Sequence, residues 1–146
     1  MLFRIRERLV CQRTELANAL RSYLYEFGLI FPQGIAQLAK IKALVEDPNC
    51  SLPEIVRNES RDLLTQVSKI TSRIDIKTRR IKDLASETDT ARRLQTMPGV
   101  GPMIALALEA FAPCMTSFRR GRDFAAWLGL VPRQYSSGGK ERLGRI

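Results

Sequence analysis

Apolar residues recur at helical spacing in the first third of the chain. Over residues 4–27 they fall three or four positions apart, or one turn further on, at Ile5, Leu9, Leu16, Leu20, Leu24 and Phe27. Gly28 follows, at a position where glycine commonly ends a helix. After a turn through 29–34, residues 35–46 repeat the pattern up to the sequence Asp-Pro-Asn-Cys. These patterns predict two amphipathic helices.

A longer pattern runs from Pro53 to about Ala91. Its apolar members alternate in steps of three and four, with Ser60 and Lys77 completing the series formed by Val56, Leu63, Val67, Ile70, Ile74, Ile81 and Leu84. This heptad seam predicts a coiled-coil-like helical arm that needs a partner. We favour a second copy of the chain, which would give a homo-oligomer through 53–91. The alternative is pairing with the first helix of the same chain.

The predicted fold class is all-α, because no stretch combines alternating apolar and polar residues with hairpin turns. The chain divides into a helical, coiled-coil region at 1–91 and a small helical domain at 92–146. No window is apolar enough to span a bilayer, and the start lacks the apolar core of a signal peptide. We therefore expect a cytoplasmic protein without membrane contact.

Residues 94–108 predict a tight hairpin between two helices. Glycine permits positive φ and close approach of the backbone, and Pro102 suits the first position of a helix, whose N-terminus can receive a phosphate. The segment resembles the helix-hairpin-helix element of many DNA-handling proteins through Leu94, Met97, Pro98, Gly99, Val100, Gly101 and Ala105. Such elements hold the phosphate backbone without reading bases. The neighbouring Arg92 and Arg93 would add phosphate contacts, and the alternative is a plain connector between packed helices.

Positive charge is concentrated after residue 90. The net charge is +9, and residues 91–146 hold nine basic and three acidic residues, a balance that favours nucleic acid as a partner. Beyond the hairpin, the candidate DNA-binding residues are Arg119, Arg120, Arg122, Arg133, Lys140, Arg142 and Arg145. A short helix before Gly129 contains Trp127, which we expect to belong to a core rather than to stack on bases.

The residue types for a metal site are scarce. The chain has no histidine, and its three widely separated cysteines are expected to be buried as small apolar side chains. The acids of residues 91–146 are only Glu109, Asp123 and Glu141, too few and too scattered for a two-metal site. We therefore predict no metal site in this chain.

Two segments have the sequences MPGVGPMIALAL and GRDFAAWLGLVPRQYSSGGKERLGRI. Together they closely resemble the C-terminal domain of the insertion-sequence one-hundred-ten family of transposases. The likeness is to its eleven-eleven subgroup above all, and this family is related to Piv-type DNA invertases. The similarity is strongest over 94–146, while 1–91 looks like the coiled-coil segment that precedes this domain. It implies DNA recombination, protomers joined by the coiled coil, and a structured guide RNA as a further partner.

The resemblance also implies a serine nucleophile. The family places it directly before a glycine, which maps it to Ser137, with Ser136 as the alternative because the doublet leaves the register open by one. In the family, magnesium and the DEDD carboxylates of an N-terminal RNase-H-like domain assist the serine. A serine hydroxyl needs such help at neutral pH, and nearby cations would stabilise a pentacovalent phosphate.

The chain departs from the family in lacking that acidic domain and in stopping at Ile146, where relatives continue. We therefore expect a transposase fragment that holds no cofactor of its own, since the magnesium would belong to the missing domain. Alone it is expected to bind nucleic acid but not to cleave or join strands. The competing interpretations are a non-enzymatic nucleic-acid-binding module and a helical oligomerisation protein.

Overall fold

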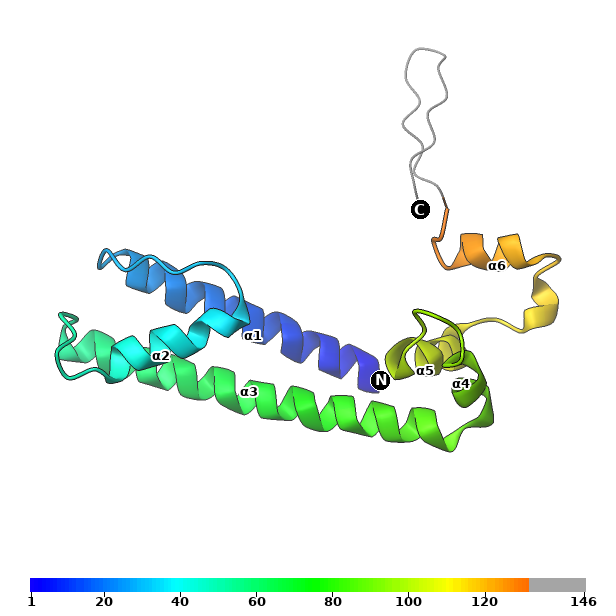
Figure 1. The fold of residues 1–146 in the computed structure, drawn as a ribbon, viewed down its shortest axis with the longest axis horizontal. Helices are drawn as coiled ribbons and strands as arrows, with labels where there is room; N and C mark the ends of the chain where they lie inside the picture. Colours follow the sequence, from blue (N-terminus) through cyan, green and yellow to red (C-terminus); the bar gives the residue numbers. More distant parts are fainter. Residues whose placement is uncertain (132–146) are drawn as a thin grey trace, which may run out of the picture. The chain divides into compact units, whose positions relative to one another are not determined.

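The computed structural model describes residues 1–131, and every regular element in that part of the chain is a helix (Figure 1). The α-helices are α1 (Leu2–Tyr25), α2 (Leu38–Glu46), α3 (Glu54–Glu87), α4 (Asp89–Leu94), α5 (Pro102–Phe111) and α6 (Gly121–Trp127), with single 3-10 turns at Ile35–Gln37 and Met115–Ser117. The all-α prediction is thus confirmed for residues 1–131. None of the helices in this range is both long and apolar enough to cross a membrane.

Contacts divide the chain into two compact units. The first is Met1–Ala107, and the second begins at Leu108, so that the boundary falls inside α5. The first unit holds α1 to α4 and the first part of α5. The second contains α6.

Helices α1 and α3 lie side by side and antiparallel, and α2 packs against them near the end of α1 (Figure 1). Their shared core consists of Ala17, Leu20 and Leu24 of α1, Leu38, Ile41 and Val45 of α2, Leu52, and Val67 of α3. Nearer the start of α1, Arg6 Nε donates a hydrogen bond of 2.8 Å to Thr78 Oγ1 on α3. The apolar seam of α3 therefore has a partner within the same chain.

The predicted heptad positions of α3 fall into two rows. One row is buried and consists of Ser60, Val67, Ile74 and Ile81. The other row keeps part of its surface exposed and consists of Val56, Leu63, Ile70, Lys77 and Leu84. The helical phase of the prediction is correct, and association with a second copy remains a prediction.

Two arginines of α3 bind the C-terminal end of α2. Arg57 donates from Nε to the Val45 carbonyl at 3.2 Å and from Nη2 to the Asp47 carbonyl at 2.9 Å, and Arg61 Nη2 lies 3.4 Å from the Val45 carbonyl. Cations stabilise a helix C-terminus because its last carbonyls carry partial negative charge. These two arginines thus stabilise the fold, although they count toward the basic charge.

The prediction of a single helix from Pro53 to about Ala91 is wrong at its C-terminal end, because the helix is interrupted at Thr88. This residue has an extended backbone, with φ −96° and ψ 137°, and the acidic Asp89 then begins α4 at its positive end. The break lets Ala91 pack with Ala85 and Ala105 in a small core in which all three are fully buried. The small alanine side chains fit this core, in which each is completely buried.

Glycine ends two helices as the sequence predicts. Gly28 has φ 77°, its N–H donates to the Tyr25 carbonyl, and the N–H of Leu29 reaches the Leu24 carbonyl. Gly129 has φ 76° and ends α6 with the same pair of bonds. This is the Schellman arrangement, which places a residue of positive φ just beyond the helix.

The prediction that all cysteines are buried is wrong. Cys11 and Cys114 are exposed, and Cys50 is half-buried. Cys11 lies on the solvent side of α1, and Cys114 lies in the loop after α5. Hydrogen bonds to Thr116 hold the pKa of the Cys114 thiol below its ordinary value.

Candidate nucleic-acid interface

The turn between α4 and α5 is a β-turn over Met97–Val100. The N–H of Val100 donates to the Met97 carbonyl at 3.1 Å, and Gly99 has φ 83°. Proline at the second position and a positive φ at the third are the features of a type II turn, which a residue with a side chain adopts only with strain. The predicted tight turn is confirmed, and Gly99 is the residue that permits it.

Gly101 requires a different explanation, because its φ is not in the positive region. Apart from its two chain neighbours, no atom of residues 1–131 would lie within 4 Å of a Cβ atom built on Gly101. The Gly101 carbonyl accepts a hydrogen bond of 2.9 Å from the N–H of Ala105, so the residue stands at the start of α5. Neither backbone strain nor packing explains a glycine here, and the space beside its backbone is open.

The N-terminus of α5 offers hydrogen-bond donors next to this open space. Pro102 is the first helical residue and has no N–H. The amides of Met103 and Ile104 follow in the first turn, where no carbonyl of the helix lies one turn back to accept from them. The positive end of the helix dipole adds to their affinity for an anion.

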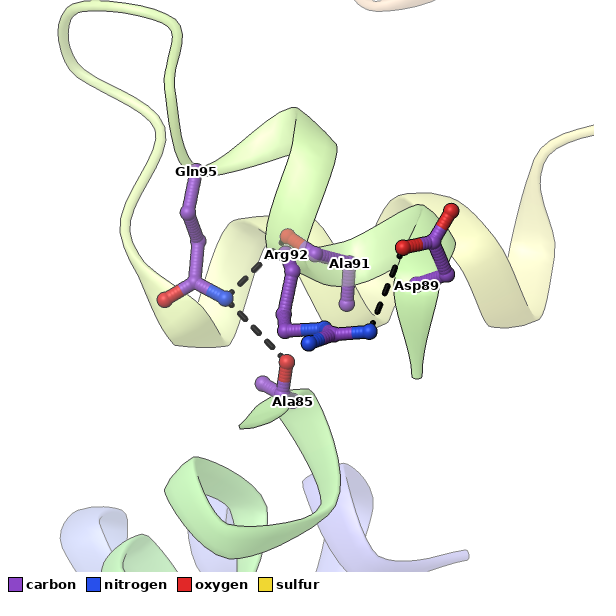
Figure 2. Close-up of polar contacts among 5 residues, drawn as sticks. All are labelled: Ala85, Asp89, Ala91, Arg92 and Gln95. Atoms are coloured by element: carbon purple, nitrogen blue, oxygen red, sulfur yellow. Dashed lines mark hydrogen bonds and ion pairs between the residues drawn. The ribbon is translucent and has the colours of Figure 1, made fainter. Parts of the chain in front are cut away.

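Gln95 fixes this hairpin to the end of α3, as Figure 2 shows. Its Nε2 donates to the Ala85 carbonyl at 3.2 Å and to the Ala91 carbonyl at 3.1 Å. Val100 is half-buried and packs against the same small alanine core, so its side chain serves the fold. Sequence analysis does not single out Gln95, because one amide bonded to backbone ten residues away leaves no periodic signal.

The two arginines of α4 are exposed beside the hairpin. Arg92 Nη2 lies 3.2 Å from Asp89 Oδ1 in an ion pair whose side chains are both largely exposed (Figure 2). Such a surface pair is worth at most about 1 kcal/mol, so a phosphate can displace the carboxylate. Arg93 lines an open surface depression with Thr90, Leu94 and Thr96.

A second cationic surface lies in the unit that begins at Leu108. Arg119, Arg120 and Arg122 are all exposed before and within the first turn of α6. The carboxylate of Asp123 accepts a bond of 3.0 Å from the Arg120 N–H and lies 4.0 Å from Arg122 Nε. The turn carries three arginines and one acid, which leaves it positively charged.

Three aromatic rings that are close to these arginines in the sequence pack against one another. Phe124 and Trp127 are stacked, with centroids 5.9 Å apart and planes 13° apart, and Phe118 meets both rings edge-on. The prediction that Trp127 belongs to a core is wrong, because 45% of its surface is exposed. The apolar flanks of Trp127 are typical of a core helix, but α6 has no buried residue.

The predicted site residues therefore fall into three groups. Arg92, Arg93, Gly99, Val100 and Gly101 come together in the α4–α5 hairpin, and Arg119, Arg120 and Arg122 share one turn. Ser136, Ser137, Arg133, Lys140, Arg142 and Arg145 lie outside the described residues. Within residues 1–131, no three His, Cys, Asp or Glu side chains gather in a way that could hold a metal ion.

Comparison with known proteins gives matches to transposases. Residues 91–146 match the family described as Transposase IS116/IS110/IS902. The chain is 38% identical to the putative transposase y4pF/y4sB of Sinorhizobium fredii over 100% of its own length and 38% of that protein. It is 39% identical to a probable family 20 transposase of Pseudomonas aeruginosa over 99% of the chain and 44% of that protein. The transposase for insertion sequence element IS1111A of Coxiella burnetii is 33% identical over 97% of the chain and 39% of that protein. No solved structure matches the chain.

The chain is thus similar to transposases along nearly its whole length. Residues 91–146 match the region that characterises the IS116/IS110/IS902 family. The chain spans about two fifths of the length of the curated relatives that it matches.

Proposed function

We propose that this chain is the DNA-binding part of an insertion-sequence transposase, and that the α4–α5 hairpin holds duplex DNA by its phosphate backbone. Gly101 is the observation that carries this proposal. Its backbone needs no glycine for conformation or for packing, yet a side chain would fill the space beside the first amides of α5. A phosphate in that space would accept hydrogen bonds from those amides and lie near exposed arginines of α4.

This contact is expected to position DNA rather than to read its sequence. Backbone amides and arginines that reach phosphate oxygens carry no base information, because every nucleotide presents the same phosphate. Choice of donor and target would then depend on another part of the complex, such as the structured guide RNA that the family resemblance implies. The relatives named transposases are more than twice as long as this chain. We propose that transposition itself also requires the parts of such a protein that this chain does not span.

The serine of the closing motif belongs to the same proposal. Ser137 is the proposed nucleophile toward a DNA phosphate, with Ser136 as its alternative, and magnesium would be held by carboxylates outside this chain. Replacing each serine by alanine in turn, in a complex that forms a covalent protein–DNA adduct, separates the two. The proposal for Ser137 is wrong if only Ser136→Ala abolishes the adduct.

Binding of duplex DNA is expected to weaken steeply with salt. If the five exposed arginines of the two cationic surfaces each neutralise one phosphate, affinity should fall roughly 100- to 1,000-fold between about 50 and 200 mM salt. Fluorescence anisotropy of a labelled duplex measures the slope of the logarithm of the binding constant against the logarithm of the salt concentration. Replacing Arg92 and Arg93 together by glutamine should reduce the magnitude of this slope by about two. Absence of binding even at low salt would contradict the proposed function and favour a purely helical oligomerisation protein.

The arm supports a second proposal, a homo-oligomer through residues 53–91. Near the start of α3, exposed Tyr23, Phe27 and Ile55 line an apolar surface depression together with Val56 and Leu63. Association of two copies would cover these side chains without disturbing the buried row of α3. Ile55 allows a test that leaves the fold intact, because 70% of its surface is exposed in a monomer and an aspartate there remains largely in solvent. Sedimentation equilibrium should show a dimer or larger species for the wild type and a monomer for Ile55→Asp, whereas a monomeric wild type would exclude this association.

A further inference from the structure

The stacked rings before and within α6 form a surface that the hairpin proposal does not use. We call Phe118, Phe124 and Trp127 the aromatic platform. Phe124 and Trp127 lie one helical turn apart and nearly parallel, while the Phe118 ring stands edge-on at 5.2 Å from Phe124 and 6.2 Å from Trp127. The three rings thus hold one another in a fixed arrangement, which limits the loss of side-chain entropy when a ligand binds.

The aromatic platform is at the surface. Trp127 has 45% of its area exposed, and α6 contributes no buried residue. Phe118 and Phe124 are half-buried, so the exposed ring of this cluster is the Trp127 indole. An exposed indole already stacked on one neighbouring ring offers a large flat apolar area to a further planar group.

Cations border this surface closely in the sequence. Arg119 and Arg120 follow Phe118 directly, and Arg122 stands two residues before Phe124. The carboxylate of Asp123 is already engaged by the Arg120 N–H and lies near Arg122, so it offsets only part of their charge. Aromatic rings interleaved with arginines form the pattern that binds single-stranded nucleic acid, with bases stacked on the rings and phosphates beside the cations.

We propose that the aromatic platform binds unpaired nucleotides, with a base stacked on Trp127 and the adjoining phosphates bound by Arg119, Arg120 and Arg122. This inference rests on the proposed function, since it assigns a second kind of nucleic-acid contact to the same protein. In a duplex the faces of the bases are covered by their neighbours, so only an unpaired base presents a free face to the indole. The flanking arginines favour this anionic ligand over an apolar protein segment, because three cations border the platform and one carboxylate offsets only part of their charge.

Trp127 is the single tryptophan of the chain, so its own fluorescence reports on the proposed contact. The full chain would be titrated with oligo(dT), with oligo(U), and with a duplex of the same length. We expect quenching by at least one of the single strands and little change with the duplex. Duplex binding by anisotropy without any quenching by either single strand would overturn this inference and leave the proposed function standing. Failure to bind any of the three nucleic acids would defeat both.

Three variants test the stacking directly by anisotropy with labelled single strands. Trp127→Leu keeps an apolar side chain but removes the flat ring, and should weaken single-strand affinity about tenfold, with duplex affinity unchanged. Trp127→Phe should retain most of the affinity, which guards against a general loss of folding. Tyr25→Leu removes another exposed aromatic ring, on α1, and should change nothing. If Trp127→Leu alters the sedimentation coefficient but not single-strand affinity, the platform is a protein–protein surface and the inference is wrong.

Discussion

Replacing Ile81 by alanine is expected to lower the free energy of unfolding by about 3 kcal/mol, within the usual range for a fully buried isoleucine. Ile81 has 0% of its surface exposed and lies in the buried row of α3. Its removal leaves a cavity that the paired helices cannot fill without shifting along the arm. Urea unfolding followed by circular dichroism in the helix band at ~220 nm measures this change. The dependence of the free energy of unfolding on urea concentration, the m value, is expected to stay constant.

Ile76 provides a matched control on the same helix. It is 60% exposed, so Ile76→Ala removes the same atoms from a position that already faces solvent. The expected change is within about 0.5 kcal/mol. Equal losses for the two variants would mean that α3 does not bury the Ile81 row as described, and that the pairing with α1 is wrong.

The course of α3 was predictable because burial follows a repeat that the sequence displays. The heptad row that includes the polar Ser60 is the row that packs inward, so the spacing decided burial even where polarity did not. The break at Thr88 was not predictable in this way. No glycine or proline marks it, and the alanine cluster that accompanies it joins Ala85 and Ala91 to Ala105, which lies on another helix and has no periodic relation to them.

In the candidate site too, features set by neighbouring residues were predictable from the sequence, and features set by tertiary packing were not. The turn at Met97–Val100 was predictable because proline followed by glycine specifies a type II turn by itself. The exposure of Trp127 was not, since apolar neighbours at helical spacing are typical of a core helix. Whether such a helix is buried depends on which other segments pack against it, and this cannot be predicted from the residues of the helix alone.

Replacing Gly101 by leucine is expected to weaken binding of duplex DNA roughly ten- to 100-fold while the fold is retained. Within the described part of the chain, a Cβ at this position meets no atom within 4 Å beyond its two chain neighbours, and the backbone is not in the positive-φ region, so we expect the folded chain to accept the side chain. The leucine would instead occupy the space in which a phosphate would approach the first amides of α5. Losing charge-assisted hydrogen bonds there costs about 1.5–3 kcal/mol, which anisotropy at a fixed low salt concentration would detect.

The matched control is Ala110→Leu, a larger side chain at the exposed far end of the same helix, which should leave affinity unchanged. Gly99 is less informative, because any side chain at φ 83° strains the turn itself and confuses loss of structure with loss of contact. For Gly101→Leu the two effects separate, since circular dichroism and the unfolding midpoint report on the fold independently of DNA. Unchanged affinity in a folded Gly101→Leu chain would show that no phosphate approaches this backbone, and the hairpin would then be a connector between packed helices.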